Sequence, residues 1–223
     1  ERESIAAILG LGKDYVCYQL LDTVEWQEPF PVIDLRNGWF INPVEEEHIP
    51  EGNIIHFEPP CAFGSGLHGT TQDCLRLILR EEMKGMRILD IGTGAGLLSV
   101  AAALMGAKEI QAVDIEDVRD EVLYNAKLNG ADDKIKVTHA DVLDPQFEME
   151  GCFDWIFVNI AADEIKQLVN FIDQHLADGG RLILSGMVTW NYEDAVTVYQ
   201  ELGYELKEIH HADEWVTAYL LRK

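Results

Sequence analysis

The chain of 223 residues lacks features that would place it among membrane, metal-binding or disulfide-bonded proteins. No apolar run approaches the ~20 residues of a membrane-spanning helix, so we expect no membrane partner. Cysteine is scarce, and its spacing is not that of a metal site. We therefore expect no metal, and reduced, buried thiols in a cytoplasmic protein. The four cysteines are Cys17, Cys61, Cys74 and Cys152.

Basic residues are also scarce: 17 lysines and arginines stand against 40 acidic residues, which gives a formal net charge of -23. Such a charge repels nucleic-acid phosphates, and we expect no direct binding of nucleic acid. Two interpretations of the charge remain open. The acidic surface either keeps the protein in solution or attracts a basic protein substrate.

Proline is nearly absent after residue 60, because six of the seven prolines lie in residues 1–60. This composition favours extended segments and turns. We expect residues 1–60 to form an N-terminal appendage and linker of mixed extended and helical structure, and residues 61–223 to form the main domain. The total length fits one ordinary domain with a modest appendage.

From residue 87 onward, strand-like apolar runs alternate with apolar residues at helical spacing, which predicts a doubly wound, mostly parallel α/β sheet. Strands are expected over residues 87–91, 109–114, 135–139, 153–158, 181–185, 204–210 and 215–221. Helices are expected over residues 72–80, 97–105, 117–129, 165–176 and 191–202. Too few residues join the last two strands for a crossover helix, so they must form an antiparallel C-terminal hairpin in a seven-stranded sheet.

The most informative segment covers residues 88–98, where a buried strand, a glycine turn and a helix start follow one another. Gly92, Gly94 and Gly96 would let the backbone approach a ligand, and the helix start would offer free N–H groups. A dinucleotide-binding turn places its third glycine one residue later, where this chain has Leu97. The turn instead resembles that of class I methyltransferases, which use S-adenosylmethionine.

Polar residues end the neighbouring strands, in the region where a doubly wound sheet binds its ligands. Asp114 ends the second strand and is expected to accept hydrogen bonds from both ribose hydroxyls. Asp141 follows the third strand, where it could accept a hydrogen bond from the adenine amino group or cap a helix. Asn159 ends the fourth strand, where it could face the methyl acceptor or form a turn.

A polar loop precedes the sheet at residues 63–71, where three glycines accompany serine, histidine and two threonines. Thr70 or Thr71 is expected to cap the helix that follows. This loop, with the glycine turn and the strand ends, resembles the catalytic domain of the bacterial ribosomal protein L11 methyltransferases. The resemblance rests on residues 62–71, 90–96, 114 and 159–160, and it extends from about residue 38 to the C-terminus.

The resemblance implies methylation of lysine side chains and of the N-terminal α-amine on a basic ribosomal protein. It also implies that S-adenosylmethionine is bound by the residues at positions 71, 92, 114 and 159. With the candidates from the strand ends and the loop, the expected cofactor contacts are Phe63, Thr71, Gly92, Gly94, Gly96, Asp114, Asp141 and Asn159.

The chain departs from the family at Gly69, where proline is usual, and over residues 161–163, which replace a more apolar stretch. The family also carries a separate N-terminal substrate-recognition domain, which is expected to be largely absent from this chain. Another protein or a small molecule is therefore the alternative methyl acceptor.

Asn159 and His68 are the expected catalytic residues. Methyl transfer to an amine requires exclusion of water, alignment and an unprotonated nitrogen, and it demands no single general base. Asn159 would accept N–H bonds from the amine and so direct its lone pair at the methyl group. His68 lies near the entry, where holding the loop is an equal interpretation. The rival functions are a cofactor-binding module without transferase activity and a nicotinamide oxidoreductase.

Overall fold

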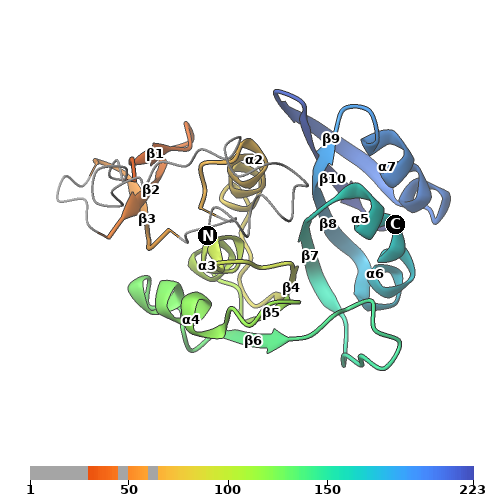
Figure 1. Cartoon of the computed structure of the whole chain (residues 1–223), viewed down its shortest axis with the longest axis horizontal. Coiled ribbons are helices and arrows are strands. Elements are labelled where there is room, and N and C mark those ends of the chain that lie inside the picture. The colour runs from red at the N-terminus through yellow and green to blue at the C-terminus, as the bar shows by residue number, and fades with distance from the viewer. Residues whose placement is uncertain (1–29, 45–49, 60–64) are drawn as a thin grey trace, which may run out of the picture. The chain divides into compact units, whose positions relative to one another are not determined.

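A computed structural model describes residues 30–44, 50–59 and 65–223. The chain divides into two compact units, Glu1–Phe30 and Pro31–Lys223. The helices and strands of the second unit are labelled in Figure 1. Within the described ranges, no helix has the length and apolar character needed to cross a membrane.

Seven strands form one sheet in the order β6-β5-β4-β7-β8-β10-β9. The first five in this order run parallel, and β10 pairs antiparallel with both β8 and β9. The strands are β4 (Arg87–Ile91), β5 (Glu109–Asp114), β6 (Ile135–His139), β7 (Phe153–Asn159), β8 (Leu176–Val188), β9 (Glu205–Ala212) and β10 (Trp215–Leu221). The predicted mostly parallel, seven-stranded sheet with an antiparallel C-terminal hairpin is confirmed.

Helices cover both faces of this sheet (Figure 1). One face carries α2 (Gly69–Ile78), α3 (Leu97–Leu104) and α4 (Arg119–Leu128), and the other carries α5 (Ala162–Gln167), α6 (Val169–His175) and α7 (Tyr192–Glu201). The start predicted for α2 is three residues late, because His68 caps this helix in place of Thr70 or Thr71. The single helix predicted over residues 165–176 is divided at Leu168, and Leu176 already belongs to β8.

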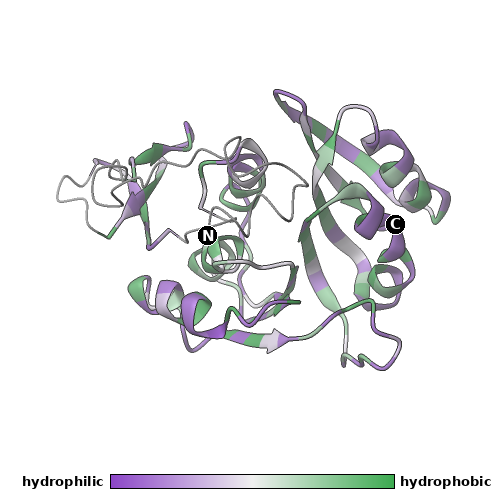
Figure 2. Ribbon diagram, viewed as in Figure 1, coloured by the Kyte–Doolittle hydropathy of each residue, from purple (hydrophilic) through white to green (hydrophobic). Residues whose placement is uncertain are grey.

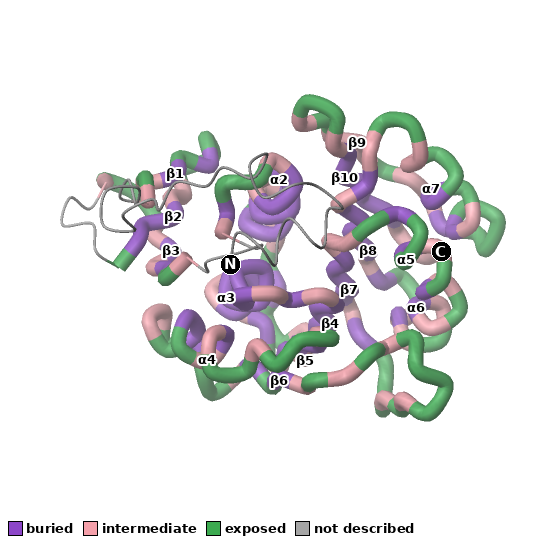
Figure 3. Tube along the Cα trace, in the orientation of Figure 1, coloured by how far each residue is buried: buried purple, intermediate pink, exposed green. Residues whose placement is uncertain are grey.

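The core lies between the sheet and its helices. Strand β7 runs through it and is buried along most of its length, as expected of a parallel strand that is covered on both faces. Its Trp155 is only 1% exposed. On the outer side, the Tyr199 hydroxyl donates a hydrogen bond to the Ile165 carbonyl at 2.7 Å and so joins α7 to α5. Figures 2 and 3 show apolar, buried strands beneath helices whose outer faces are polar and exposed.

A smaller sheet is built from β1 (Ile33–Asp34), β2 (Trp39–Pro43) and β3 (Asn53–Phe57). Asn125 of α4 and Asn129, which follows that helix, bind backbone groups in and just after β3. His56 donates its N–H to Asn129 Oδ1 at 3.0 Å, and Glu58 donates its N–H to Asn125 Oδ1 at 2.8 Å. The described parts of residues 30–59 consist of short strands and turns. The predictions for residues 1–29 and 45–49 lie outside the described residues.

The cysteines only partly match the expectation of buried thiols. Cys74 is buried, and burial raises the pKa of its thiol to about 12. Cys152 is exposed, which contradicts the prediction, because it lies in the loop directly before β7 rather than within the strand. Cys17 and Cys61 lie outside the described residues.

Candidate functional site

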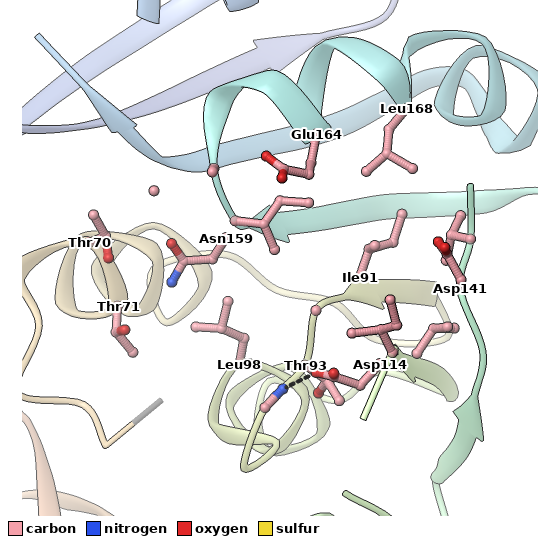
Figure 4. Close-up of a pocket in the computed structure, with 18 of the residues that line it drawn as sticks. Thr70, Thr71, Ile91, Thr93, Leu98, Asp114, Asp141, Asn159, Glu164 and Leu168 are labelled. Atoms are coloured by element: carbon pink, nitrogen blue, oxygen red, sulfur yellow. Dashed lines mark hydrogen bonds between the residues drawn. The ribbon is translucent and has the colours of Figure 1, made fainter. Parts of the chain in front are cut away.

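A cavity of about 710 Å³ lies where β4, β5 and β7 end (Figure 4). Its volume is in the range of pockets that bind nucleotide-sized ligands. The predicted site residues that line it are His68, Thr71, Gly92, Gly94, Asp114, Asp141 and Asn159. Phe63 lies outside the described residues.

The glycine turn forms the floor between β4 and α3. Gly92, Gly94 and Gly96 have φ angles of 72°, 53° and 82°, which favour glycine. A Cβ on Gly92 would lie 2.6 Å from Ile160 Cγ2, so the turn packs directly against the residue that follows Asn159. Gly96, a predicted cofactor contact, does not line the cavity, because it is the N-cap of α3 and packs closely against Val122 of α4.

Asp114 connects the end of β5 to this turn. Its Oδ2 accepts a hydrogen bond from the Gly94 N–H at 2.8 Å, and its Oδ1 accepts one from the Glu116 N–H at 3.0 Å. An ionised carboxylate offers about four lone-pair sites. The two occupied sites therefore leave capacity for the hydroxyl pair of a ribose.

Asp141 lies across the cavity from Asn159 (Figure 4). It is exposed, and its Oδ1 accepts a hydrogen bond from the Leu143 N–H at 2.8 Å. A turn, not a helix, follows the aspartate in the described segment 140–150. The helix-capping alternative is therefore wrong, and the second carboxylate oxygen is available to a ligand.

Asp90 ties β4, the glycine turn and α3 together. Its Oδ2 accepts hydrogen bonds from Thr93 Oγ1 at 2.8 Å and from Ser99 Oγ at 2.7 Å. Its Oδ1 is buried and has no hydrogen-bond partner within the described part of the chain. Burial raises the pKa of this carboxyl to about 6.

Asn159 presents an amide to the cavity from the end of β7. The amide makes no hydrogen bond to any other described residue, so the turn-forming alternative has no bond to support it. The backbone beyond it is fixed, because Ile160 donates its N–H to the Ser185 carbonyl at 3.1 Å. Gly186 (φ 84°) permits the close approach of the Ile160 carbonyl.

His68 lies at the start of α2 and is exposed. Its Nδ1 lies 2.7 Å from Thr70 Oγ1 and accepts a longer hydrogen bond from the Thr70 N–H at 3.4 Å. The ring also meets Trp215 edge to face, with 4.7 Å between the ring centres. These contacts give the imidazole a structural role at the cavity wall.

The predicted site residues do not include four further polar or aromatic residues of the wall, Thr70, Thr93, Glu164 and Trp215. Thr70 stands next to a predicted contact. Trp215 reaches the site through its pairing with Val188 in β8, which the sequence does not reveal. Glu164 lies in the first turn of the helix after Asn159, and extending the search beyond the strand end by one helical turn would have found it.

The sheet order, the glycine turn after β4 and the acidic end of β5 define a class I, S-adenosylmethionine-dependent methyltransferase. The sequence model of the ribosomal protein L11 methyltransferase family (PrmA) matches residues 22–223. The chain therefore belongs to this family.

Individual relatives agree with this assignment. The ribosomal protein L11 methyltransferase of Syntrophotalea carbinolica is 36% identical over 196 residues, which are 85% of this chain and 62% of that protein. Its counterpart in an Exiguobacterium species is 30% identical over 97% of this chain and 70% of that protein. The crystal structure of the ribosomal protein L11 methylase of Lactobacillus delbrueckii subsp. bulgaricus superposes with a TM-score of 0.77, at 31% identity, over 87% of this chain and 100% of that chain.

Proposed function

We propose that the protein transfers methyl groups from S-adenosylmethionine to amine nitrogens of ribosomal protein L11, on lysine side chains or on the N-terminal α-amine. One cavity combines the glycine turn and Asp114 on one side with the amide of Asn159 on the other, and this observation carries the proposal. Family membership favours this substrate over another protein or a small molecule. A ribosomal substrate implies action in the cytoplasm.

The donor side of the cavity has suitable groups for the methyl donor. When bound, S-adenosylmethionine supplies an electrophilic methyl group on a sulfonium ion. Asp114 would hold its ribose hydroxyls, and Asp141 would accept a hydrogen bond from its adenine amino group. The backbone of Gly92 and Gly94, with Thr71, would complete the wall against water, which the reaction must exclude.

The acceptor side must present a neutral amine. A free lysine has a pKa of about 10.4, so deprotonation at neutral pH costs roughly 4–5 kcal/mol. The Asn159 side-chain oxygen would accept an N–H bond from the neutral amine and aim the remaining lone pair at the methyl carbon. The nitrogen lone pair then displaces sulfur from that carbon, and the ammonium product releases a proton to solvent.

The direct test is label transfer. The protein is incubated with S-adenosylmethionine carrying a radioactive methyl group and with purified large-subunit ribosomal proteins, and the labelled band is identified. We expect the label on ribosomal protein L11. Label on a different protein would refute the substrate, and calorimetric binding of a reduced nicotinamide dinucleotide but not of S-adenosylmethionine would refute the reaction.

Replacement of Asn159 by alanine separates acceptor alignment from donor binding. We expect Asn159→Ala to keep the affinity for S-adenosylmethionine within about threefold and to lower turnover on the order of 10²-fold, as loss of a positioned polar group does. Asn170→Ala, an exposed asparagine of α6, serves as the matched control and should leave both values unchanged. Equal losses of binding and turnover in Asn159→Ala would make the amide mainly a donor contact.

A further inference from the structure

Glu164 differs from the other carboxylates of the cavity in its hydrogen bonding. Asp114 and Asp141 each accept hydrogen bonds from nearby backbone N–H groups, as described above. The Glu164 carboxylate accepts no hydrogen bond and forms no ion pair with any residue in the described ranges. It is therefore the cavity carboxylate with all of its lone pairs free for a ligand.

Glu164 lies on the side of the cavity where we expect the methyl acceptor. Figure 4 shows Glu164 extending from α5 over the cavity on the side of Asn159, opposite Asp141. The preceding residue, Asp163, does not line the cavity. It is 80% exposed and pairs with Lys166 at 2.7 Å. Two adjacent carboxylates of one helical turn thus have different surroundings, and only Glu164 lines the cavity.

We propose that Glu164 binds the cationic amine of the protein substrate and holds it beside Asn159; this inference rests on the proposed function. The acceptor enters as an ammonium ion, which a carboxylate attracts and an amide attracts less, and it loses one proton to solvent before its nitrogen attacks the methyl carbon. During transfer, positive charge leaves sulfur and appears on nitrogen, because the N–C bond forms as the C–S bond breaks. A carboxylate on the nitrogen side of the cavity stabilises that charge where it develops.

The same carboxylate affects the pH dependence of the reaction. A negative charge close to an amine favours its protonated form and raises its pKa. Removal of the charge should therefore let the bound amine lose its proton at lower pH. The other titratable groups of the cavity are His68, Asp114 and Asp141. Two other charged residues, Asp163 and Lys166, lie on α5 itself. Asp194 of α7, which packs against α5, interacts electrostatically with Lys166.

Glu164→Gln and Asp163→Asn form a matched pair, because each removes one negative charge from the same helical turn. With ribosomal protein L11 as acceptor, we expect Glu164→Gln to lower kcat/KM about tenfold, as loss of one charge-assisted hydrogen bond does, without changing the KM for S-adenosylmethionine. The pH at which kcat is half-maximal should fall by about one unit. Asp163→Asn should match the wild type in all three values. Equal behaviour of the two variants would overturn the inference.

A binding measurement keeps this inference separate from the choice of substrate. Calorimetry with S-adenosylhomocysteine present compares a short lysine peptide with the same peptide carrying norleucine. We expect wild type to prefer the lysine peptide about tenfold, and Glu164→Gln to lose the preference. Loss of the preference would support the role of Glu164 even if ribosomal protein L11 is not methylated. A wild type without any preference would refute it even if ribosomal protein L11 is methylated.

Discussion

Asp90, a buried residue that holds the glycine turn, combines a structural role with an energetic cost. Two hydroxyl groups donate to one of its oxygens, while the other oxygen is buried without a partner in the described part of the chain. Burial disfavours the ionised form and raises the pKa of the carboxyl from 3.8 to about 6. The folded state therefore binds a proton more tightly than the unfolded state does.

This shift sets the sign of a pH effect on stability. Below pH 4 Asp90 is protonated in both states, and between pH 4 and about 6 only the folded state retains the proton, so the free energy of unfolding falls as pH rises. We expect Asp90→Asn, which stays neutral, to gain on the order of 3 kcal/mol relative to wild type between pH 4 and pH 7. Urea denaturation of both proteins across this range measures the difference. A difference that does not change with pH would contradict the raised pKa.

At the scale of elements, the contacts at the start of α2 favour a helix-capping role for His68 over a catalytic role. The imidazole caps the helix through Thr70 and packs against Trp215 of β10, so the cavity wall depends on this helix end. A cap accounts for the position of His68 without a proton-transfer step. The exposed ring lines the cavity all the same.

Two variants distinguish the cap from catalysis. We expect His68→Ala to lose about 1 kcal/mol of stability, because no acceptor remains for the Thr70 N–H, and His68→Asn to recover most of it. Thermal unfolding and the rate of methyl transfer are measured on both. A general acid or base contributes roughly 10²- to 10⁴-fold to a rate. A loss of that size in a stable His68→Asn protein would show that the imidazole acts on the substrate.

The sequence predicted the strands of the large sheet better than the helices. The bounds of β4, β5, β6 and β10 were predicted to the residue, because short apolar runs between polar residues mark buried strands locally. The start of α2 was missed because histidine is not a usual capping residue. Trp215 was missed because strand register, rather than local sequence, brings it to the cavity. Glu164 was missed because it lies one helical turn beyond the strand end, where the search stopped.

At the scale of the whole molecule, net charge is the property that bears on the substrate. We expect the formal charge of -23 to favour the approach of a basic protein and to disfavour that of free nucleic acid. Long-range attraction of this kind speeds the encounter and does not act on the chemical step. The net charge can be predicted directly from the sequence, because the count of charged residues does not depend on the fold.

Because long-range attraction affects the encounter and not the chemical step, we expect salt to affect only the binding of the protein substrate. Raising the salt concentration from about 0.05 M to about 0.5 M shortens the screening length severalfold. We expect the KM for ribosomal protein L11 to rise about tenfold, as weakened electrostatic steering requires, while kcat and the KM for S-adenosylmethionine change little. Steady-state assays at several salt concentrations measure all three. A KM for the protein that is insensitive to salt would assign the acidic surface to solubility alone.

We infer that this cavity delivers a methyl group to an amine nitrogen. Peptide mass spectrometry of ribosomal protein L11 after incubation with the protein and S-adenosylmethionine locates the methyl groups residue by residue. We expect methylation of lysine side chains or of the N-terminal α-amine, and its loss with Asn159→Ala. Methyl groups on carboxylates or other non-amine atoms, or an unmodified ribosomal protein L11, would contradict it.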